Sequence, residues 1–434
     1  MTQYAPDHDA SIVGVCVACF GLPNSQLHFR TPEKRLTLVS NSLNMTHMID
    51  RILRNAIKNH TKSVLLLGPR QVGKSTLCEQ LNPDFSLNLA DEEYFRQHLN
   101  DPGLIKRIIN ALPNQKNLIL IDEIQRIPSI LNTVQALIDS NKNLRFLLTG
   151  SSARKLRRGQ ANLLPGRVLI EYLPPLVYWE IKHNFDLHKV LTIGTLPEVY
   201  LQDYGPELLH SYVAAYLKEE IQAEAFTKNL ASYSRFLDLA AELSGQYMNY
   251  SKVASDSEIH KETIRRYMEI LSDTLLVELI PSYKDVDKKR RARQKEKFIF
   301  FDLGVRNSLL GKQSAAAFSK EDLGRLFEQW FILQIIYFNK LYKKSWKIST
   351  YRDAMGVEVD LIIETNDVCL AIEIKSSMRA QEKMFKGLNK FEEITKKQFK
   401  KYLVYQGEFE QDFDELGYAV PYQIFLERTL PNLN

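Results

Sequence analysis

The stretch Gly68-Pro69-Arg70-Gln71-Val72-Gly73-Lys74-Ser75 restricts the fold of this chain more than any other feature. An apolar run over residues 63–67 precedes it, with the length and composition of a buried parallel strand. A helical segment follows from Thr76 and is stopped by Asn82-Pro83. A glycine-rich turn between a strand and a helix aims backbone N–H groups and the positive end of the helix dipole at one point. The sequence therefore predicts an α/β fold with a polyphosphate-binding loop.

The residues of this loop and Thr76 are candidate nucleotide-binding residues. Lys74 is expected to reach the β and γ phosphates, and the Ser75 hydroxyl to complete the shell of a Mg²⁺ ion. ATP and Mg²⁺ are thus the predicted cofactors. An ordinary strand-turn-helix is the weaker alternative, because few chance matches to this pattern fall between a strand and a helix.

A second apolar run, residues 117–121, ends in the carboxylates Asp122 and Glu123. At the carboxyl end of a strand, Asp122 can orient the water shell of Mg²⁺ and Glu123 can polarise an attacking water molecule. A buried strand with a solvated acidic turn would be the favoured interpretation if this run stood alone. The phosphate loop upstream makes the catalytic interpretation stronger.

A third strand is expected over residues 145–150 and brings Thr149 and Ser151 to the same edge. Strands that alternate with helices predict a parallel sheet, with the ligand at the carboxyl ends of the strands. Either hydroxyl could contact the γ-phosphate or the attacking water. Capping of the next helix is an equally good interpretation for each hydroxyl taken singly.

Length and composition set the frame for these motifs. A chain of 434 residues, with 44% hydrophobic and 25% charged residues, is expected to form two to four globular domains. Four scattered cysteines and the lack of a signal-peptide pattern or a run of transmembrane length favour a cytoplasmic protein with no membrane partner. Residues 1–44 are expected to be a poorly ordered extension, with Met45 as a second candidate start.

Together, the loop, the Leu-Ile-Leu-Ile-Asp-Glu-Ile-Gln strand, the Leu-Thr-Gly-Ser-Ser strand end, Gly166-Arg167 and Pro174-Pro175-Leu176 with Glu180 resemble a known family. They are similar to the prokaryotic AAA-type ATPases whose C-terminal half is a domain of unassigned function. The resemblance runs from about Met45 to near the C-terminus. It implies that Arg167 acts in trans on a neighbour's nucleotide, which requires a homo-oligomer. A structural salt bridge of Arg167 has nearly equal weight.

The segment after Glu180 is predicted to be mostly helical. Two short helices, residues 251–254 and 261–271, are followed by strands over 275–280 and 297–302. Seven of the ten residues from Lys288 to Lys297 are basic. This order predicts a winged helix whose basic wing contacts DNA or RNA. A lid that only packs on the ATPase domain is the alternative.

In the C-terminal third, two strands are expected over residues 356–363 and 369–375, joined by a tight turn. Side chains two apart on a strand share a face, so Glu373 and Lys375 point the same way and Asp360 can join them. Two carboxylates can bind Mg²⁺ and a lysine can orient the attacking water. This pattern resembles that of PD-(D/E)xK nucleases, with Glu328 as a helical fourth member and Val359 in place of the proline. The resemblance implies a restriction-endonuclease-like fold.

Four segments are therefore expected: the extension 1–44, a P-loop ATPase domain 45–182, a helical lid with a winged helix 183–305, and a restriction-endonuclease-like domain 306–434. One hypothesis is an ATP-hydrolysing motor or switch on nucleic acid, with a nuclease domain. The other is an ATP-gated interaction module whose C-terminal domain is a catalytically silent binding platform.

Overall fold

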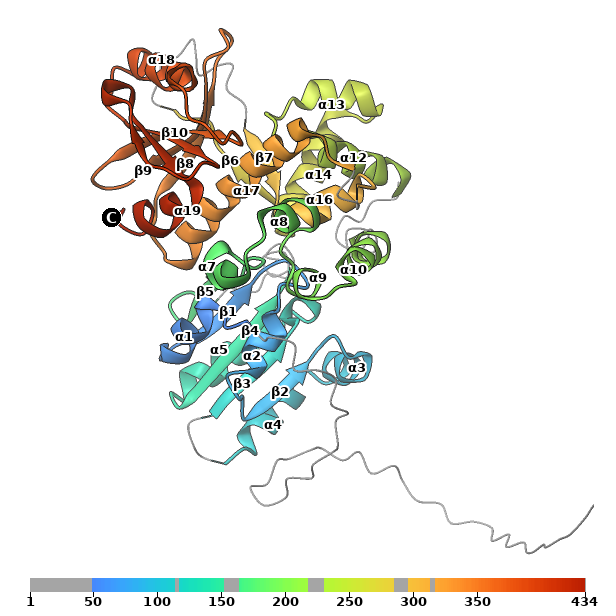
Figure 1. Cartoon of the computed structure of the whole chain (residues 1–434). Helices are drawn as coiled ribbons and strands as arrows, with labels where there is room; N and C mark the ends of the chain where they lie inside the picture. Colours follow the sequence, from blue (N-terminus) through green and yellow to red (C-terminus); the bar gives the residue numbers. More distant parts are fainter. Residues whose placement is uncertain are drawn as a thin grey trace, which may run out of the picture. The chain divides into compact units, whose positions relative to one another are not determined.

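The computed structural model describes residues 49–113, 117–151, 164–217, 230–284, 296–312 and 317–433 (Figure 1). All of them belong to the compact unit His47–Asn434. The predicted extension 1–44 and the predicted basic wing over 288–295 lie outside the described residues.

The first half of this unit is built on a parallel sheet of five strands, in the order β2-β3-β4-β1-β5. Both faces of β1, an interior strand of this sheet, are covered, because its alternate side chains belong to two different hydrophobic clusters. The predicted α/β fold with a parallel sheet is confirmed, although β5 was not expected from the sequence. The strands are β1 (Ser63–Leu67), β2 (Phe85–Asn88), β3 (Asn117–Asp122), β4 (Leu144–Gly150) and β5 (Val168–Tyr172).

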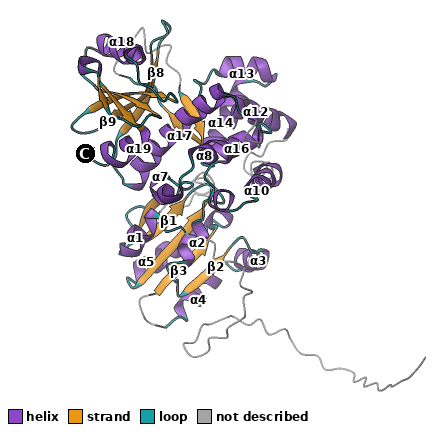
Figure 2. Cartoon of the chain, in the orientation of Figure 1, coloured by secondary structure: helices purple, strands orange, loops and turns teal. Residues whose placement is uncertain are grey.

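Helices cover this sheet (Figure 2). Helix α3 was not expected from the sequence, because it is largely polar. Its N-cap is Asp91, whose side chain accepts a hydrogen bond from the Glu93 backbone N–H at 2.8 Å. The helices are α1 (Ile52–Asn59), α2 (Lys74–Glu79), α3 (Glu92–Asn100), α4 (Leu104–Asn110), the 3₁₀ turn η1 (Ile124–Arg126) and α5 (Ile130–Ser140).

The middle of the chain is mostly helical, as predicted, and ends in a two-stranded antiparallel sheet of β6 and β7. Its elements are α7 (Tyr178–Ile181), η2 (Lys182–Asn184), α8 (Leu187–Ile193), α9 (Pro197–Leu201), α10 (Gly205–Ser211), the π-helical η3 (Tyr212–Leu217), α12 (Leu230–Leu243), α13 (Tyr250–Ser257), α14 (Lys261–Asp273), β6 (Val277–Ile280), β7 (Lys297–Phe300) and α16 (Leu303–Leu309).

The C-terminal part contains a mixed sheet in the order β12-β13-β11-β10-β9-β8. The first three strands along the chain, β8 to β10, are antiparallel, and β11 returns parallel to β10 after helix α18. The elements are α17 (Lys320–Leu341), β8 (Lys347–Arg352), β9 (Glu358–Glu364), β10 (Cys369–Lys375), η5 (Glu382–Phe385), α18 (Lys386–Thr395), β11 (Lys400–Tyr405), β12 (Gln411–Asp412), η6 (Asp414–Leu416), β13 (Tyr418–Pro421), α19 (Tyr422–Ile424) and η7 (Phe425–Thr429).

A buried carboxylate, Asp302, fastens the turn between α8 and α9 to the start of α16. Its Oδ2 accepts a hydrogen bond from the Thr195 backbone N–H at 2.6 Å, and its Oδ1 accepts one from Val305 N–H at 3.0 Å. Gly194 has a φ of 78°, and a Cβ there would lie 2.1 Å from Asp302 Oδ1. The close approach therefore requires glycine at position 194.

Burial raises the pKa of Asp302 from its ordinary value to about 6, against the lowering effect of the backbone donors. Because the pKa is higher in the folded than in the unfolded chain, folding favours the protonated carboxyl, and that contribution is lost as the pH rises through 6. We expect the free energy of unfolding of the wild type, relative to Asp302→Asn, to fall by about 2 kcal/mol between pH 4 and pH 7. Urea unfolding of both proteins across this range measures it. A difference that does not vary with pH would contradict the assignment.

Candidate functional site

The phosphate loop begins where β1 ends, and its backbone is held close to the neighbouring strands. The Gly68 N–H donates to the Gly150 carbonyl at 3.3 Å, and a Cβ on Gly68 would lie 2.4 Å from the Leu173 carbonyl oxygen. Gln71 and Gly73 have positive φ angles, 59° and 87°. The loop thus turns through left-handed conformations that expose its N–H groups at the start of α2.

Lys74 is buried and its ammonium lies against the loop. Its Nζ donates to the carbonyl oxygens of Gly68 at 2.9 Å and Pro69 at 2.7 Å. A fixed cation beside a run of backbone N–H groups is the arrangement that binds a polyphosphate. The residues of the loop fit a nucleoside triphosphate.

Three polar side chains from different elements meet beside the loop. Ser75 Oγ, on α2, donates to Asp122 Oδ2 at 2.6 Å, and the Thr149 hydroxyl, at the end of β4, donates to the other oxygen of Asp122. Thr149 also accepts a hydrogen bond from the Glu123 N–H at 3.0 Å. Hydroxyl and carboxylate oxygens are the donors that Mg²⁺ prefers, so Ser75 and Asp122 fit a magnesium ion that accompanies the triphosphate.

Gln125, which was not predicted as a site residue, holds the carboxylate of Glu123 in place. The Gln125 amide donates to Glu123 Oε2 and, at 2.9 Å, to Ser151 Oγ. Glu123 itself has a positive φ of 57°, which a non-glycine residue rarely adopts. The structure thus gathers Glu123 and Ser151 through a buried amide. The one sign in the sequence that Gln125 belongs to the site was its position two residues after Glu123.

Arg51, which lies behind the loop, was not predicted from the sequence to belong to the site. This buried guanidinium donates to the carbonyl oxygens of Val72 at 2.6 Å and Pro174 at 2.7 Å, and forms an ion pair with Glu180 at 3.0 Å. It therefore fixes the position of the loop relative to the segment after β5. An arginine directly before an apolar helical pattern was the only sign of it in the sequence.

Arg167 lies at the amino ends of the parallel strands, whereas the phosphate loop lies at their carboxyl ends. Arg167 precedes β5, whose first residue pairs with Ser63 at the start of β1, so about 16 Å of strand separates it from the loop. Its guanidinium forms two hydrogen bonds with Asp139, at 2.9 and 3.0 Å. Arg167 does not meet the loop of its own chain, and a role in trans stays a prediction.

The C-terminal sheet brings a second group of predicted residues together. The antiparallel register of β9 and β10, continued by one residue, sets Asp360 opposite Glu373. Lys375 Nζ lies 2.5 Å from Glu373 Oε1 and 3.8 Å from Asp360 Oδ2. Asp360 Oδ2 also accepts a hydrogen bond from the Ile374 N–H at 2.8 Å.

Glu328, on α17, joins this group through a residue that was not predicted to be there. Lys297, at the start of β7, is only 2% exposed, and its Nζ lies 2.8 Å from Glu328 Oε1. We call Glu328, Asp360, Glu373, Lys297 and Lys375 the acidic cluster. In the sequence, Lys297 stands out only as the last residue of the basic stretch 288–297.

The predicted metal site at Glu328, Asp360 and Glu373 is not assembled. In the part of the chain that the structure describes, no group of three or more His, Cys, Asp or Glu side chains is placed to hold a metal ion. The reason is physical, because lysine ammonium groups take up carboxylate oxygens that a metal ion would need. The carboxylates converge as predicted, but with cations supplied by the protein.

Electrostatics in the acidic cluster show that its carboxylates are crowded. Burial and the neighbouring Asp360 raise the pKa of both Glu328 and Glu373. Burial opposes the charge of Lys297, but Glu328 and Asp360 outweigh it and raise the pKa of its ammonium. Glu373 Oε2 is buried without a hydrogen-bond partner. The cluster is therefore short of positive charge.

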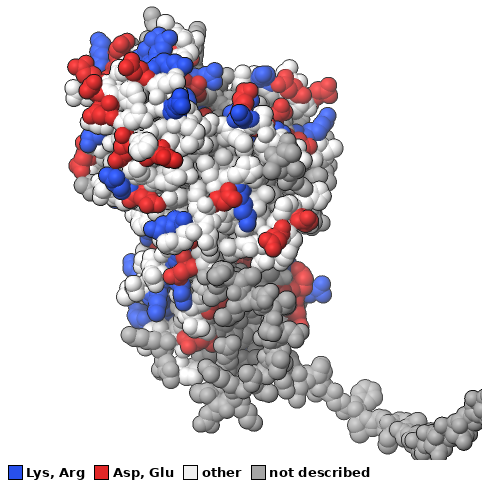
Figure 3. Space-filling model, viewed as in Figure 1, with Lys and Arg blue, Asp and Glu red and all other residues white. Residues whose placement is uncertain are grey.

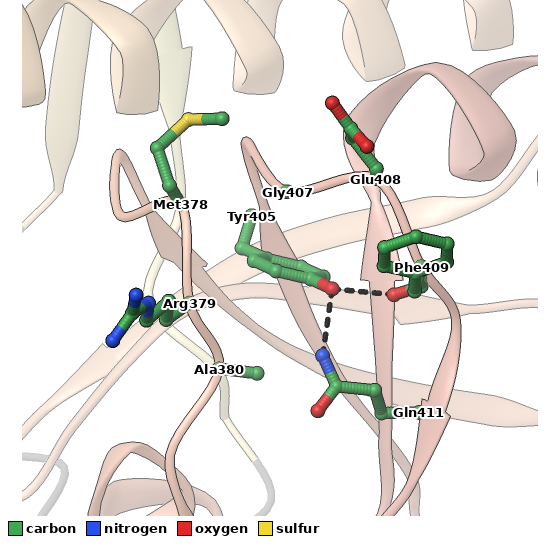
Figure 4. A pocket seen from close by; sticks show the side chains of 8 residues that line it. All are labelled: Met378, Arg379, Ala380, Tyr405, Gly407, Glu408, Phe409 and Gln411. Atoms are coloured by element: carbon green, nitrogen blue, oxygen red, sulfur yellow. Dashed lines mark hydrogen bonds between the residues drawn. The ribbon is translucent and has the colours of Figure 1, made fainter.

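A hollow of about 410 Å³ opens beyond the ends of β10 and β11 (Figure 4). The Tyr405 hydroxyl spans one side of it, donating to the Phe409 carbonyl and accepting from Gln411 Nε2 at 2.8 Å. Met378 and Phe409 are 62% and 73% exposed beside it. Lys375 and Tyr405 are opposite each other in the parallel pair of β10 and β11. The hollow and the acidic cluster therefore lie at the same end of these two strands.

Comparison with known proteins divides the chain into three matched regions. Residues 60–182 match a family described as an AAA domain, residues 184–316 a domain of unknown function (DUF8612), and residues 323–425 another domain of unknown function (DUF4143). Residues 60–182 are thus similar to an AAA domain, in agreement with the AAA-type resemblance of the phosphate-loop segment. No helix among the described residues is long and apolar enough to cross a membrane.

Among curated proteins, an uncharacterized protein of Mycobacterium tuberculosis is 28% identical over 335 residues, which cover 74% of this chain and 72% of that protein. An uncharacterized protein of Methanocaldococcus jannaschii is 25% identical over 393 residues, 77% of this chain and 80% of that protein. A solved signal transduction ATPase from Pyrococcus horikoshii shares 15% identity over 70% of this chain and 46% of its own, with a TM-score of 0.25.

Replacement of Lys74 by alanine should weaken ATP binding about tenfold or more, because the phosphates lose a buried ammonium. Isothermal titration calorimetry with MgATP measures the change. Lys142→Ala, at an exposed lysine of the same domain, is the control and should bind as the wild type does. Equal affinity of Lys74→Ala and the wild type would exclude Lys74 from the site.

Proposed function

We propose that this chain, whose residues 60–182 match an AAA domain, is an ATPase that binds MgATP at the Gly68–Ser75 loop and hydrolyses it. The observation that carries the proposal is the hydrogen-bonded group of Ser75, Asp122, Thr149 and Glu123 beside the loop. These residues come from α2, β3 and β4 and meet only because of the parallel sheet.

Each residue has a distinct role in this proposal. The loop N–H groups and Lys74 hold the phosphates, while Ser75 and Asp122 would hold the magnesium ion, which supplies neutralisation of the phosphate charge. Glu123 orients the attacking water and accepts its proton, and Gln125 keeps the Glu123 carboxylate in place. Thr149 fixes the backbone of Glu123 from the neighbouring strand.

The replacement Glu123→Gln should leave ATP binding intact and slow hydrolysis about 100-fold or more, because the amide keeps the shape of the side chain but cannot accept the proton. Steady-state phosphate release and calorimetry on the same samples separate the two effects. Glu93→Gln, at an exposed glutamate of α3, is the matched control. Normal turnover in Glu123→Gln would remove Glu123 from the mechanism.

A second proposal concerns the C-terminal part, a restriction-endonuclease-like domain that acts on DNA or RNA. It is supported by the order α17, β8, β9, β10, α18, β11 and by the convergence of Asp360, Glu373 and Lys375. Lys and Arg side chains alternate with Asp and Glu on the face seen in Figure 3. A winged helix over α12 to β7, and a homo-oligomer that uses Arg167, belong to the same proposal.

The nuclease proposal predicts cleavage of DNA or RNA by the full chain in the presence of ATP and Mn²⁺, and loss of cleavage in Asp360→Asn. Asp360 is expected to be essential because it lies opposite Glu373 in the sheet and its Oδ2 is 3.8 Å from Lys375 Nζ. Asp367→Asn, on the exposed turn between β9 and β10, is the control and should cleave normally. If the wild-type chain cleaves neither DNA nor RNA, the C-terminal domain is a binding platform instead.

A further inference from the structure

The acidic cluster contains a cation that comes from outside the C-terminal sheet. Glu328, Asp360, Glu373 and Lys375 belong to α17, β9 and β10, whereas Lys297 belongs to β7, which pairs with β6. We propose that, in the nucleotide-free chain, Lys297 is a built-in counter-cation that closes the acidic cluster to divalent metal ions. This inference rests on the proposed nuclease-like function and deepens it.

The burial of Lys297 is the first argument. Its side chain is 2% exposed, whereas that of Lys375 is 39% exposed. Its Nζ lies 2.8 Å from Glu328 Oε1 and 5.2 Å from the centre of the Tyr247 ring. A lysine with four flexible carbons normally keeps its ammonium in water. This ammonium is instead held between a carboxylate and an aromatic face.

The balance of charge is the second argument. With every group ionised, three carboxylates face two ammonium groups, so one negative charge stays in excess and Glu373 Oε2 has no partner. A divalent ion in place of the Lys297 ammonium would balance the cluster. The Lys297 ammonium already occupies Glu328 Oε1, so Lys297 and a metal ion bound through that oxygen would exclude each other.

The anchoring of β7 is the third argument, because it shows that Lys297 is not a loosely placed surface residue. The Phe301 carbonyl, directly after β7, accepts a hydrogen bond from the Tyr337 hydroxyl of α17 at 2.6 Å. The next residue, Asp302, binds the Thr195 N–H. Lys297 can therefore leave the cluster only by a change of its own side chain or by movement of β7 as a unit.

The test is a titration of the nucleotide-free full chain with Mn²⁺, followed by the electron paramagnetic resonance signal of free Mn²⁺. Lys297→Met keeps the length of the side chain and removes its charge. We expect it to bind one additional Mn²⁺ about tenfold or more tightly than the wild type, and Asp360→Asn in the same chain to abolish that site. Lys340→Met, which removes the lysine that pairs with Glu278 at 2.5 Å, is the control and should bind Mn²⁺ as the wild type does.

Loss of a buried charge partner can unfold a protein, so a second variant covers that case. The double replacement Lys297→Met with Glu328→Leu removes both charges together, a change that buried ion pairs commonly tolerate. This double variant keeps Asp360 and Glu373 as ligands for Mn²⁺, including Glu373 Oε2, which has no hydrogen-bond partner. Equal Mn²⁺ binding by the folded variant and the wild type, or a new site that survives Asp360→Asn, would overturn the inference. Neither readout depends on ATP hydrolysis or on cleavage, so a failure here is distinct from a failure of the proposed activities.

Discussion

The buried ion pair of Arg51 with Glu180 is the constraint on which the nucleotide site depends. A phosphate loop needs its N–H groups free for the ligand, so its carbonyl groups must be satisfied from behind. Arg51 does this for Val72 while it also binds the Pro174 carbonyl. Glu180 balances the arginine and accepts the N–H groups of Ile52 and Val177, at 2.9 and 3.2 Å. Removal of either charge would leave the other buried and unpaired, which is costly.

Two buried lysines show how differently one side chain can be used. Lys74 is bound by two neutral carbonyl oxygens, which a phosphate can replace at little cost. Lys297 is bound by the carboxyl group of Glu328 in a desolvated cluster, where an ion pair is much stronger than a hydrogen bond to a neutral carbonyl. The first arrangement suits a group that waits for a ligand. The second suits a group that competes with one.

Much of the framework follows from local sequence. The apolar runs that became β1, β3 and β10 are short, uniform and bounded by turn residues, and the structure places them within a residue of the prediction. The alternation of Glu373 and Lys375, with a tight turn before them, was enough to place Asp360 beside them. Helix α3 was missed because its sequence is polar and its burial is small.

The residues that could not be predicted act over long distances in the chain. Arg51 meets Glu180 across 129 positions, and Lys297, on strand β7, meets Glu328, on helix α17, across 31 positions. No local period or spacing encodes such pairs, because they depend on how separate elements pack. The predicted metal site shows the same limit, since the carboxylates could be placed from sequence but the lysine among them could not.

The anchoring of the loop by Arg51 also bears on which piece of this chain can fold by itself. The match to the AAA domain begins at residue 60, after both Arg51 and the whole of α1. At the other end, the Tyr178 N–H donates to Gln334 of α17 at 2.8 Å, and its hydroxyl donates to Glu427 at 2.6 Å. A fragment cut at the limits of the recognisable domain would lose the clamp behind its loop and expose groups that the C-terminal helices satisfy. The unit of folding is thus larger than residues 60–182, the part that matches the AAA domain.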